Sequence, residues 1–148
     1  MSTLDKAIFI AAQAHIGQKD RYGKPYILHP ARLMMNVDSD AEKIVAILHD
    51  VVEDSDWTLE QLRKEGFSSG IITAVDCVTR RDDEPYMDYI ERLRSNKIAR
   101  KVKLADLKDN MDLRRIDKLS NIDLERLKKY HLAWRILMDD ELKFSTSK

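Results

Sequence analysis

The sequence contains few residues that bend or cross-link a chain. Among 148 residues there are one cysteine, four glycines and three prolines. A single cysteine excludes an intrachain disulfide and fits a reducing compartment, so we expect a cytoplasmic location. The few glycines and prolines stand between segments and form no low-complexity linker, and the length suits one core. We therefore expect a single domain over residues 1–148.

Neither sign of charge dominates the composition. The 26 basic and 26 acidic side chains cancel, so net charge gives no reason to expect a nucleic-acid polymer or a membrane as a partner. A local basic pocket for a small anion stays open. No apolar run approaches the roughly 18 residues of a membrane span. Asp5, Lys6 and Gln13 interrupt the apolar stretch near the N-terminus, unlike in a signal peptide. The sequence leaves the oligomeric state open.

Apolar residues recur with the period of an α-helix almost throughout, and no convincing alternating strand is present. Capping residues, glycines and prolines divide the pattern into about seven or eight helices with short connections. The predicted ranges are near 4–15, 29–37, 41–52, 58–65, 69–78, 85–94, 96–115 and from 121 onward. The fold class is therefore all-α. The last helix is predicted to carry its apolar side on Leu124, Leu127, His131, Trp134, Met138 and Leu142.

The stretch AILHDVVED, at positions 46–54, changes abruptly from apolar to polar. His49, Asp50, Glu53 and Asp54 follow three apolar residues. Ionised groups are costly to bury unless they are paired or bind a metal. In a helix, residues four apart share a face, so two polar pairs are predicted on adjacent rows at one helix end.

Two other positions supply matching partners. His29 follows a loop at the start of a helix, and Asp106 lies within an otherwise amphipathic helix, where aspartate has poor propensity. With His49 and Asp50 they would form a shell of two histidines and two aspartates that suits a catalytic divalent ion such as manganese, zinc or iron. Open positions would remain for water and substrate. The residues alone leave open solvated carboxylates and a core histidine.

Longer motifs point to a family. The stretches HDVVED and VKLADLKDN resemble the HD-type phosphohydrolase superfamily, whose fold is an all-α bundle with a metal in its core. The upstream segment AHIGQKDRYGKPYILHP is similar to the hydrolase domain of RelA/SpoT-type proteins, and KLADLKDNMDLRR resembles that family's K-L-A-D-x-x-x-N stretch. The match runs from about residue 11 to 115 in the same order. It implies an HD-domain helical bundle, with a metal between helices, that acts as a stand-alone small alarmone hydrolase.

The resemblance also implies roles for single residues. Manganese is the family's usual ion, although other divalent ions stay open, and the positions that match its ligands are His29, His49, Asp50 and Asp106. Glu53 and Asp54 match the carboxylates that orient or deprotonate the attacking water. The implied reaction is hydrolysis of the 3′-pyrophosphate of guanosine tetra- or pentaphosphate to GDP or GTP and pyrophosphate.

Substrate contacts are expected from basic and amide side chains. The resemblance implies that Arg21 packs against the base and that Asn110 contacts the nucleotide near its ribose. Lys24, Arg80 and Arg81 are candidates for the remaining phosphate charge.

The chain also departs from the family pattern. Asp20 precedes Arg21 in the basic loop, and Leu107 and Asp112 stand where basic residues are frequent. These departures are expected to remove positive charge near the nucleotide. They keep two alternatives open: an HD-fold phosphohydrolase that acts on another nucleotide, and a catalytically weak alarmone-binding module. Glu53 favours an enzyme, because a pure binder needs no water-activating carboxylate.

Overall fold

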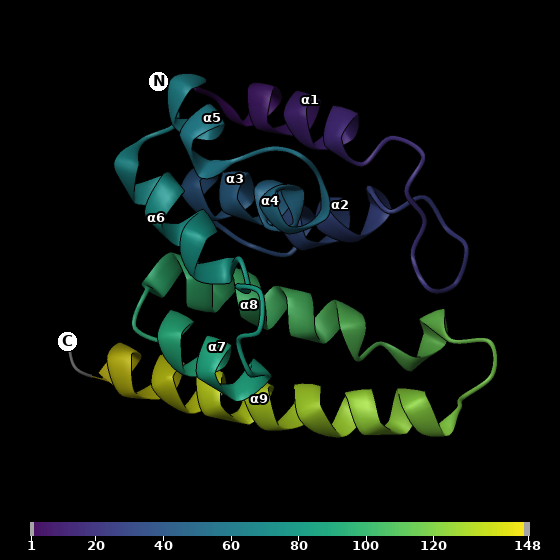
Figure 1. The fold of residues 1–148 in the computed structure, drawn as a ribbon. Helices are drawn as coiled ribbons and strands as arrows, with labels where there is room; N and C mark the ends of the chain where they lie inside the picture. The colour runs from purple at the N-terminus through teal and green to yellow at the C-terminus, as the bar shows by residue number, and fades with distance from the viewer. Residues whose placement is uncertain (1, 147–148) are drawn as a thin grey trace.

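The computed structural model describes residues 2–146, and within that range the chain is all-α, which confirms the predicted fold class (Figure 1). Its helices are α1 (Leu4–Ala14), α2 (Leu28–Met35), α3 (Asp40–Leu48), α4 (Val51–Asp54), α5 (Leu59–Lys64), α6 (Ser69–Val78), α7 (Tyr86–Leu93), α8 (Lys97–Asn110), the 3₁₀ helix η1 (Leu113–Arg115) and α9 (Asn121–Thr146). None of the helices described combines the length and apolar character that crossing a bilayer requires.

Capping side chains define where several helices begin. Ser39 starts α3 and forms a capping box with Glu42, in which each side chain bonds the other residue's backbone N–H. Thr58 and Gln61 do the same at the start of α5. These boxes satisfy N–H groups that the first turn of a helix leaves unpaired. They explain why the predicted starts of these helices agree with the structure to within about one residue.

The core is built around α3 and α8. Helix α3 packs against α1, α2, α6 and α8, and α9 lies along α8 (Figure 1). The residues from Ile44 to Leu48 are all buried, because a helix surrounded by other helices is apolar on every side. The C-terminal end of α3 therefore brings whatever follows it directly into the interior.

The predicted helix over 41–52 is wrong in one respect, because it breaks at His49 and Asp50. Helix α3 ends at Leu48 and α4 starts at Val51, with Asp50 at φ −105° and ψ 1° between them. In an unbroken α-helix, neighbouring side chains point about 100° apart. The break allows His49 and Asp50 to point at the same place.

The predicted helix over 96–115 is also divided. Helix α8 ends at Asn110, and η1 begins after Asp112, whose carboxylate accepts a hydrogen bond from the Arg114 N–H at 3.1 Å. This early end turns the chain back, so that Arg115 donates to the backbone oxygen of Asp109 at 2.9 Å.

The apolar side predicted for the last helix is wrong in part, because Trp134 packs against the core but His131 is exposed. Leu124 is 42% exposed and Leu142 is 60% exposed, whereas α9 buries Ala133, Leu137 and Asp140. Ala133 is fully buried on the side of α9 that packs against the core. The Asp140 carboxylate accepts two hydrogen bonds from Arg94, in the α7–α8 connection. A bidentate ion pair has a strict geometry, so this pair links the C-terminal half of α9 to the α7–α8 connection.

The Glu42 cap gives stability a dependence on pH. Burial opposes ionisation of Glu42, but the backbone N–H groups of Ser39 and Asp38 outweigh it and hold its pKa below the ordinary 4.5. Its stabilising contribution is therefore fully present above pH 4.5 and is lost as the pH falls through the lowered pKa. We expect Glu42→Gln to reduce the free energy of unfolding by about 1 kcal/mol at pH 7.

Urea unfolding of both proteins at several pH values measures this difference. It should shrink steadily below pH 4.5, because the wild-type carboxylate then becomes neutral like the amide. A difference that stays constant down to pH 2 would contradict the assignment of the effect to the ionised cap.

Candidate active site

The structure brings together the four residues that the sequence predicts as metal ligands. His29 comes from α2, His49 and Asp50 from the α3–α4 break, and Asp106 from α8. His29 Nε2 lies 2.8 Å from Asp106 Oδ1, and His49 Nε2 lies 2.8 Å from Asp50 Oδ2. The two cross distances are 4.0 Å, from His29 Nε2 to Asp50 Oδ2, and 3.6 Å, from His49 Nε2 to Asp106 Oδ1. Nitrogen and carboxylate oxygen atoms therefore converge on one point.

Both imidazoles are oriented through their other nitrogen. His49 Nδ1 lies 2.8 Å from the backbone oxygen of Ala46, and His29 Nδ1 lies 2.6 Å from Asp109 Oδ2. Each acceptor holds a proton on Nδ1, so Nε2 is the nitrogen that faces the cluster. Without a metal, burial opposes protonation of both rings, but the carboxylates of Asp106 and Asp50 outweigh it and raise the pKa of both imidazoles. A bound cation would take the place of the protons on Nε2. His49 Nε2 is buried and makes no hydrogen bond within the described residues. A divalent cation fits this donor set, because it satisfies that nitrogen and offsets the carboxylate charge.

Asp106 also has compensating partners within the protein. The buried Lys103 Nζ donates to Asp106 Oδ2 at 2.7 Å, and Asn110 Nδ2 donates to Asp106 Oδ1 at 3.0 Å. Burial opposes ionisation of Asp106, but the Lys103 ammonium and both imidazoles outweigh it and hold its pKa well below the ordinary range. Asp106 therefore stays an anion in the interior.

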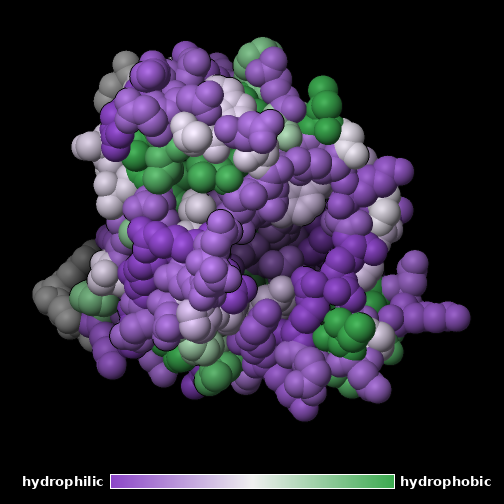
Figure 2. Space-filling model, in the orientation of Figure 1, coloured by the Kyte–Doolittle hydropathy of each residue, from purple (hydrophilic) through white to green (hydrophobic). Residues whose placement is uncertain are grey.

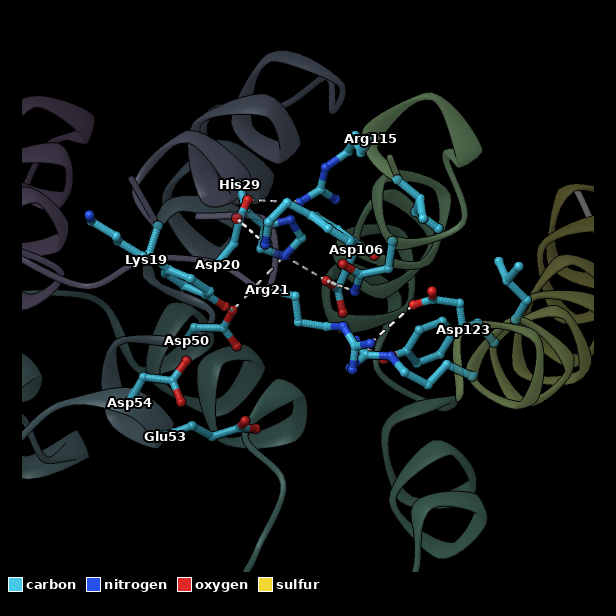
Figure 3. A pocket seen from close by; sticks show the side chains of 17 residues that line it. Lys19, Asp20, Arg21, His29, Asp50, Glu53, Asp54, Asp106, Arg115 and Asp123 are labelled. Carbon is cyan, nitrogen blue, oxygen red and sulfur yellow. Dashed lines mark hydrogen bonds and ion pairs between the residues drawn. The ribbon is translucent and has the colours of Figure 1, made fainter. Parts of the chain in front are cut away.

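His29, Asp50 and Asp106 of the cluster form one wall of a cavity of about 390 Å³, and His49 lies buried outside its lining. Figure 2 shows a hollow lined with hydrophilic residues on this face of the molecule. In Figure 3 the carboxylates of Glu53 and Asp54 lie near Asp50, and Arg21 and Asp123 lie across the cavity. Basic and aromatic side chains complete the lining, among them Lys19, Arg115, Arg126, Tyr22 and Tyr130. The cavity thus combines carboxylates near the proposed ligands with cations and aromatic rings on its other walls.

The pKa values of both carboxyl groups of α4, Glu53 and Asp54, are raised above their ordinary values. Glu53 is exposed as a whole residue, but desolvation of its carboxyl group, and then the charge of Asp50, raise its pKa to about 7. Burial and Asp50 also raise the pKa of Asp54. One oxygen of Glu53 accepts a hydrogen bond from the backbone N–H of Arg80. A carboxylate with a pKa near 7 is suited to exchange a proton with water at physiological pH.

The residues predicted to bind substrate divide into two groups. Arg21 and Asn110 line the cavity, although Arg21 Nη2 already contacts Asp123 Oδ1 at 3.1 Å. Lys24 is exposed and lies outside the lining. Arg80 lies in the neighbouring loop, where its Nε donates to the backbone oxygen of Glu84 at 2.8 Å. The structure therefore brings Arg21 and Asn110, but not Lys24 or the Arg80 side chain, to this cavity.

Two of the three residues that depart from the family pattern lie outside the lining of the cavity. Leu107 is completely buried in the core, and Asp112 pairs with Arg114 outside the lining. Contrary to expectation, neither of these two positions therefore faces the cavity. Asp20 does line the cavity, and its carboxylate accepts from two backbone N–H groups of its own loop and contacts Arg115 at 3.4 Å. Of the three, Asp20 alone therefore lies where it can affect a ligand.

Sequence reasoning missed the supporting residues. Asp109 orients His29 and is itself held by Arg32 Nε at 2.8 Å and Arg115 Nη1 at 2.9 Å. The Tyr26 hydroxyl donates to the Asp50 carboxylate. One signal was present for Asp109, since it follows Asp106 by three positions and shares its helix face. Arg32 and Arg115 carry no such signal, because they meet only through the fold.

Curated relatives give an independent comparison. A Vibrio cholerae protein named guanosine-3′,5′-bis(diphosphate) 3′-pyrophosphohydrolase is 36% identical over 113 residues, which cover 74% of this chain and 16% of that protein. A Haemophilus influenzae protein of the same name is 42% identical over 77 residues, 49% of this chain and 11% of that protein. A Mycobacterium leprae protein named probable GTP pyrophosphokinase is 40% identical over 86 residues, 55% and 11%. The matched chain thus spans about a sixth or less of these relatives. No family model matches the sequence.

A solved structure shares the fold. It is described as a metazoan ortholog of SpoT that hydrolyses ppGpp, and it superimposes with a TM-score of 0.72 over 95% of this chain and 85% of that chain, at 24% identity. The resemblance to the hydrolase domain of RelA/SpoT-family proteins, predicted from the motifs, is thereby confirmed in sequence and in fold.

A first prediction concerns metal binding. Asp106→Asn keeps the shape of the side chain but removes a charged ligand, so we expect the affinity for Mn²⁺, measured by isothermal titration calorimetry, to fall by about 100-fold. Asp112→Asn is the matched control, because Asp112 pairs with Arg114 and does not line the cavity. Equal affinities in the Asp106→Asn variant and the wild type would contradict the assignment of Asp106.

A second prediction concerns the pKa of Glu53. In metal-free protein we expect its carboxyl carbon to titrate by NMR near pH 7. Added Mg²⁺ should lower that pKa, because a cation beside Asp50 offsets the negative charge that helps to raise it. Glu53→Gln assigns the resonance. A titration near pH 4.5 in the metal-free protein would show that Asp50 and burial do not act on Glu53.

Proposed function

We propose that this chain is a metal-dependent hydrolase that removes the 3′-pyrophosphate of guanosine tetra- or pentaphosphate, giving GDP or GTP and pyrophosphate. The observation that carries the proposal is the grouping of His29, His49 and Asp50, with Asp106 2.8 Å from His29, beside a cavity that also holds cations and aromatic rings. The names of the relatives and of the structural neighbour support the choice of substrate.

His29, His49, Asp50 and Asp106 would hold the metal, and we propose Mn²⁺, which accepts mixed nitrogen and oxygen ligands. When bound, such an ion supplies Lewis acidity toward phosphate oxygens and makes water more acidic. The protein's own contribution is to fix both histidine tautomers through Ala46 and Asp109.

Glu53 would act as the general base. Its pKa near 7 allows it to be ionised and still take up a proton at neutral pH. Asp54, on the same wall of the cavity, would orient the attacking water. The water oxygen would attack the phosphorus that is bonded to the 3′-oxygen while Glu53 accepts a proton from that water. The bond between this phosphorus and the 3′-oxygen breaks, the 3′-oxygen takes up a proton to become the hydroxyl of the nucleotide product, and pyrophosphate is released.

The nucleotide would occupy the rest of the cavity. Asn110, which donates to Asp106 and lines the cavity, would contact the nucleotide. Arg21 would exchange its contact with Asp123 for a contact with the nucleotide. A guanidinium can donate to a phosphate oxygen as it does to a carboxylate oxygen. A small phosphorylated substrate and one free cysteine suit a cytoplasmic protein.

A second substrate is favoured by one observation. Asp20 and Asp123 bring carboxylates into the cavity beside Arg115 and Arg21. These carboxylates reduce the positive potential available to a substrate with two pyrophosphate groups. Another phosphorylated nucleotide of lower charge is therefore the alternative substrate for the same chemistry.

Release of pyrophosphate from guanosine tetraphosphate by the Mn²⁺-loaded protein tests the proposal. We expect turnover, and a fall in kcat of about 100-fold or more in Glu53→Gln, because that is the usual contribution of a general base. Glu60→Gln is the matched control, since Glu60 is exposed on α5 and pairs with Arg63.

Absence of release from folded, metal-loaded protein would exclude the alarmone. A panel of 3′- and 5′-phosphorylated nucleotides, including guanosine tetraphosphate, then separates another substrate from a module that binds without turnover.

A further inference from the structure

The loop between α6 and α7, residues 79–85, lies against the proposed base. The backbone N–H of Arg80 donates to Glu53 Oε1. Within residues 2–146 this is the hydrogen bond that the Glu53 carboxylate accepts, and α4, which carries Glu53, is a helix of four residues. A glutamate side chain has three rotatable bonds, so this contact from the loop determines where the carboxylate points.

Arg92 on α7 binds the loop at several points. Its Nε donates to Glu84 Oε2 at 2.9 Å and its Nη2 to Glu84 Oε1 at 2.9 Å. The same guanidinium donates to the backbone oxygen of Thr79 at 2.8 Å and to that of Asp76 at 3.2 Å. A planar guanidinium with five donors suits such a task, whereas an ammonium does not. One side chain thus holds both ends of the loop.

Glu84 passes this constraint on to Arg80. Its backbone oxygen accepts from Arg80 Nε at 2.8 Å, and its Oε1 accepts from the Arg81 N–H at 3.1 Å. The hydrogen bonds from Arg92 hold the pKa of Glu84 at about 2, so the pair stays ionised across the range in which an enzyme works. Arg92, Glu84 and Arg80 therefore form a continuous series of contacts that ends at Glu53.

We propose that Arg92, acting through Glu84, is a positioning residue for the hydrolysis: it fixes the 79–85 loop so that the Arg80 N–H holds one oxygen of Glu53 and leaves the other free to take the proton of the attacking water. This proposal rests on the proposed function of Glu53. The hydrogen bonds of Arg92 go to Glu84, Thr79 and Asp76, and none of them goes to the four proposed metal ligands. Its effect should therefore fall on the chemical step and not on metal affinity.

Arg92→Lys tests this, with Arg94→Lys as the matched control. Arg94 is two positions further along and forms the same bidentate pair, through Nε and Nη2, with Asp140 at 2.8 and 2.9 Å. We expect Arg92→Lys to lower kcat about tenfold with KM within twofold, because misplacing a catalytic group slows the reaction itself. Arg94→Lys should leave both constants unchanged. In a Glu53→Gln background, Arg92→Lys should have no further effect.

The backbone amide of Arg80 provides a readout that needs no substrate. In a ¹H–¹⁵N NMR spectrum its proton should move upfield in Glu53→Gln, which assigns the bond, and in Arg92→Lys, but not in Arg94→Lys. This result stands even if guanosine tetraphosphate is not hydrolysed, so failure of the substrate assignment is distinguishable from failure of the positioning role.

Three results would overturn the proposal. They are an unchanged Arg80 amide in folded Arg92→Lys, a loss that appears in KM instead of kcat, and an equal loss in the Glu53→Gln background. If Arg92→Lys does not fold, Glu84→Gln replaces it, because that variant keeps the size of the side chain and weakens the same two hydrogen bonds.

Discussion

The mutual compensation of buried charges is the constraint on which this structure depends. Asp106 is an anion in the interior, and it is tolerated because Lys103 and two imidazoles lie against it. Isolated ions of this kind would be too costly to bury. The core of α3 and α8 excludes water from one side of the cluster, and the cavity opens on the other. The same arrangement of carboxylates and imidazoles offers the oxygen and nitrogen atoms that a divalent cation would bind.

Backbone geometry converts this compensation into a site. The break after Leu48 turns His49 and Asp50 toward each other, and the tautomer of each histidine is selected by an acceptor on the far side of its ring. The orienting groups are as necessary as the ligands, because an imidazole that presented N–H would repel a cation. Arg32 and Arg115 donate to Asp109 and so hold the carboxylate that orients His29.

The sequence predicted most of the helices from local signals, whereas the four-residue cluster was predicted from the family motifs, because His29 and Asp106 lie 77 positions apart. Caps such as Ser39 and the spacing of His49 from Glu53 are visible in the chain itself. The contacts of α9 were not predictable, since one of them is an ion pair between residues 46 positions apart, Arg94 and Asp140. The contact of Arg21 with Asp123, across 102 positions, was hidden for the same reason. Non-local ionic contacts carry no periodic pattern, so they are found only in the folded protein.

The central claim is that four side chains form one cation site. A crystal structure of the protein grown with Mn²⁺, with anomalous scattering measured at the manganese edge, tests it directly. The account predicts one strong peak within bonding distance of Nε2 of His29, Nε2 of His49, and the carboxylates of Asp50 and Asp106. A peak elsewhere, for example at the acidic loop of residues 82–84, with none between the two histidines, would contradict it.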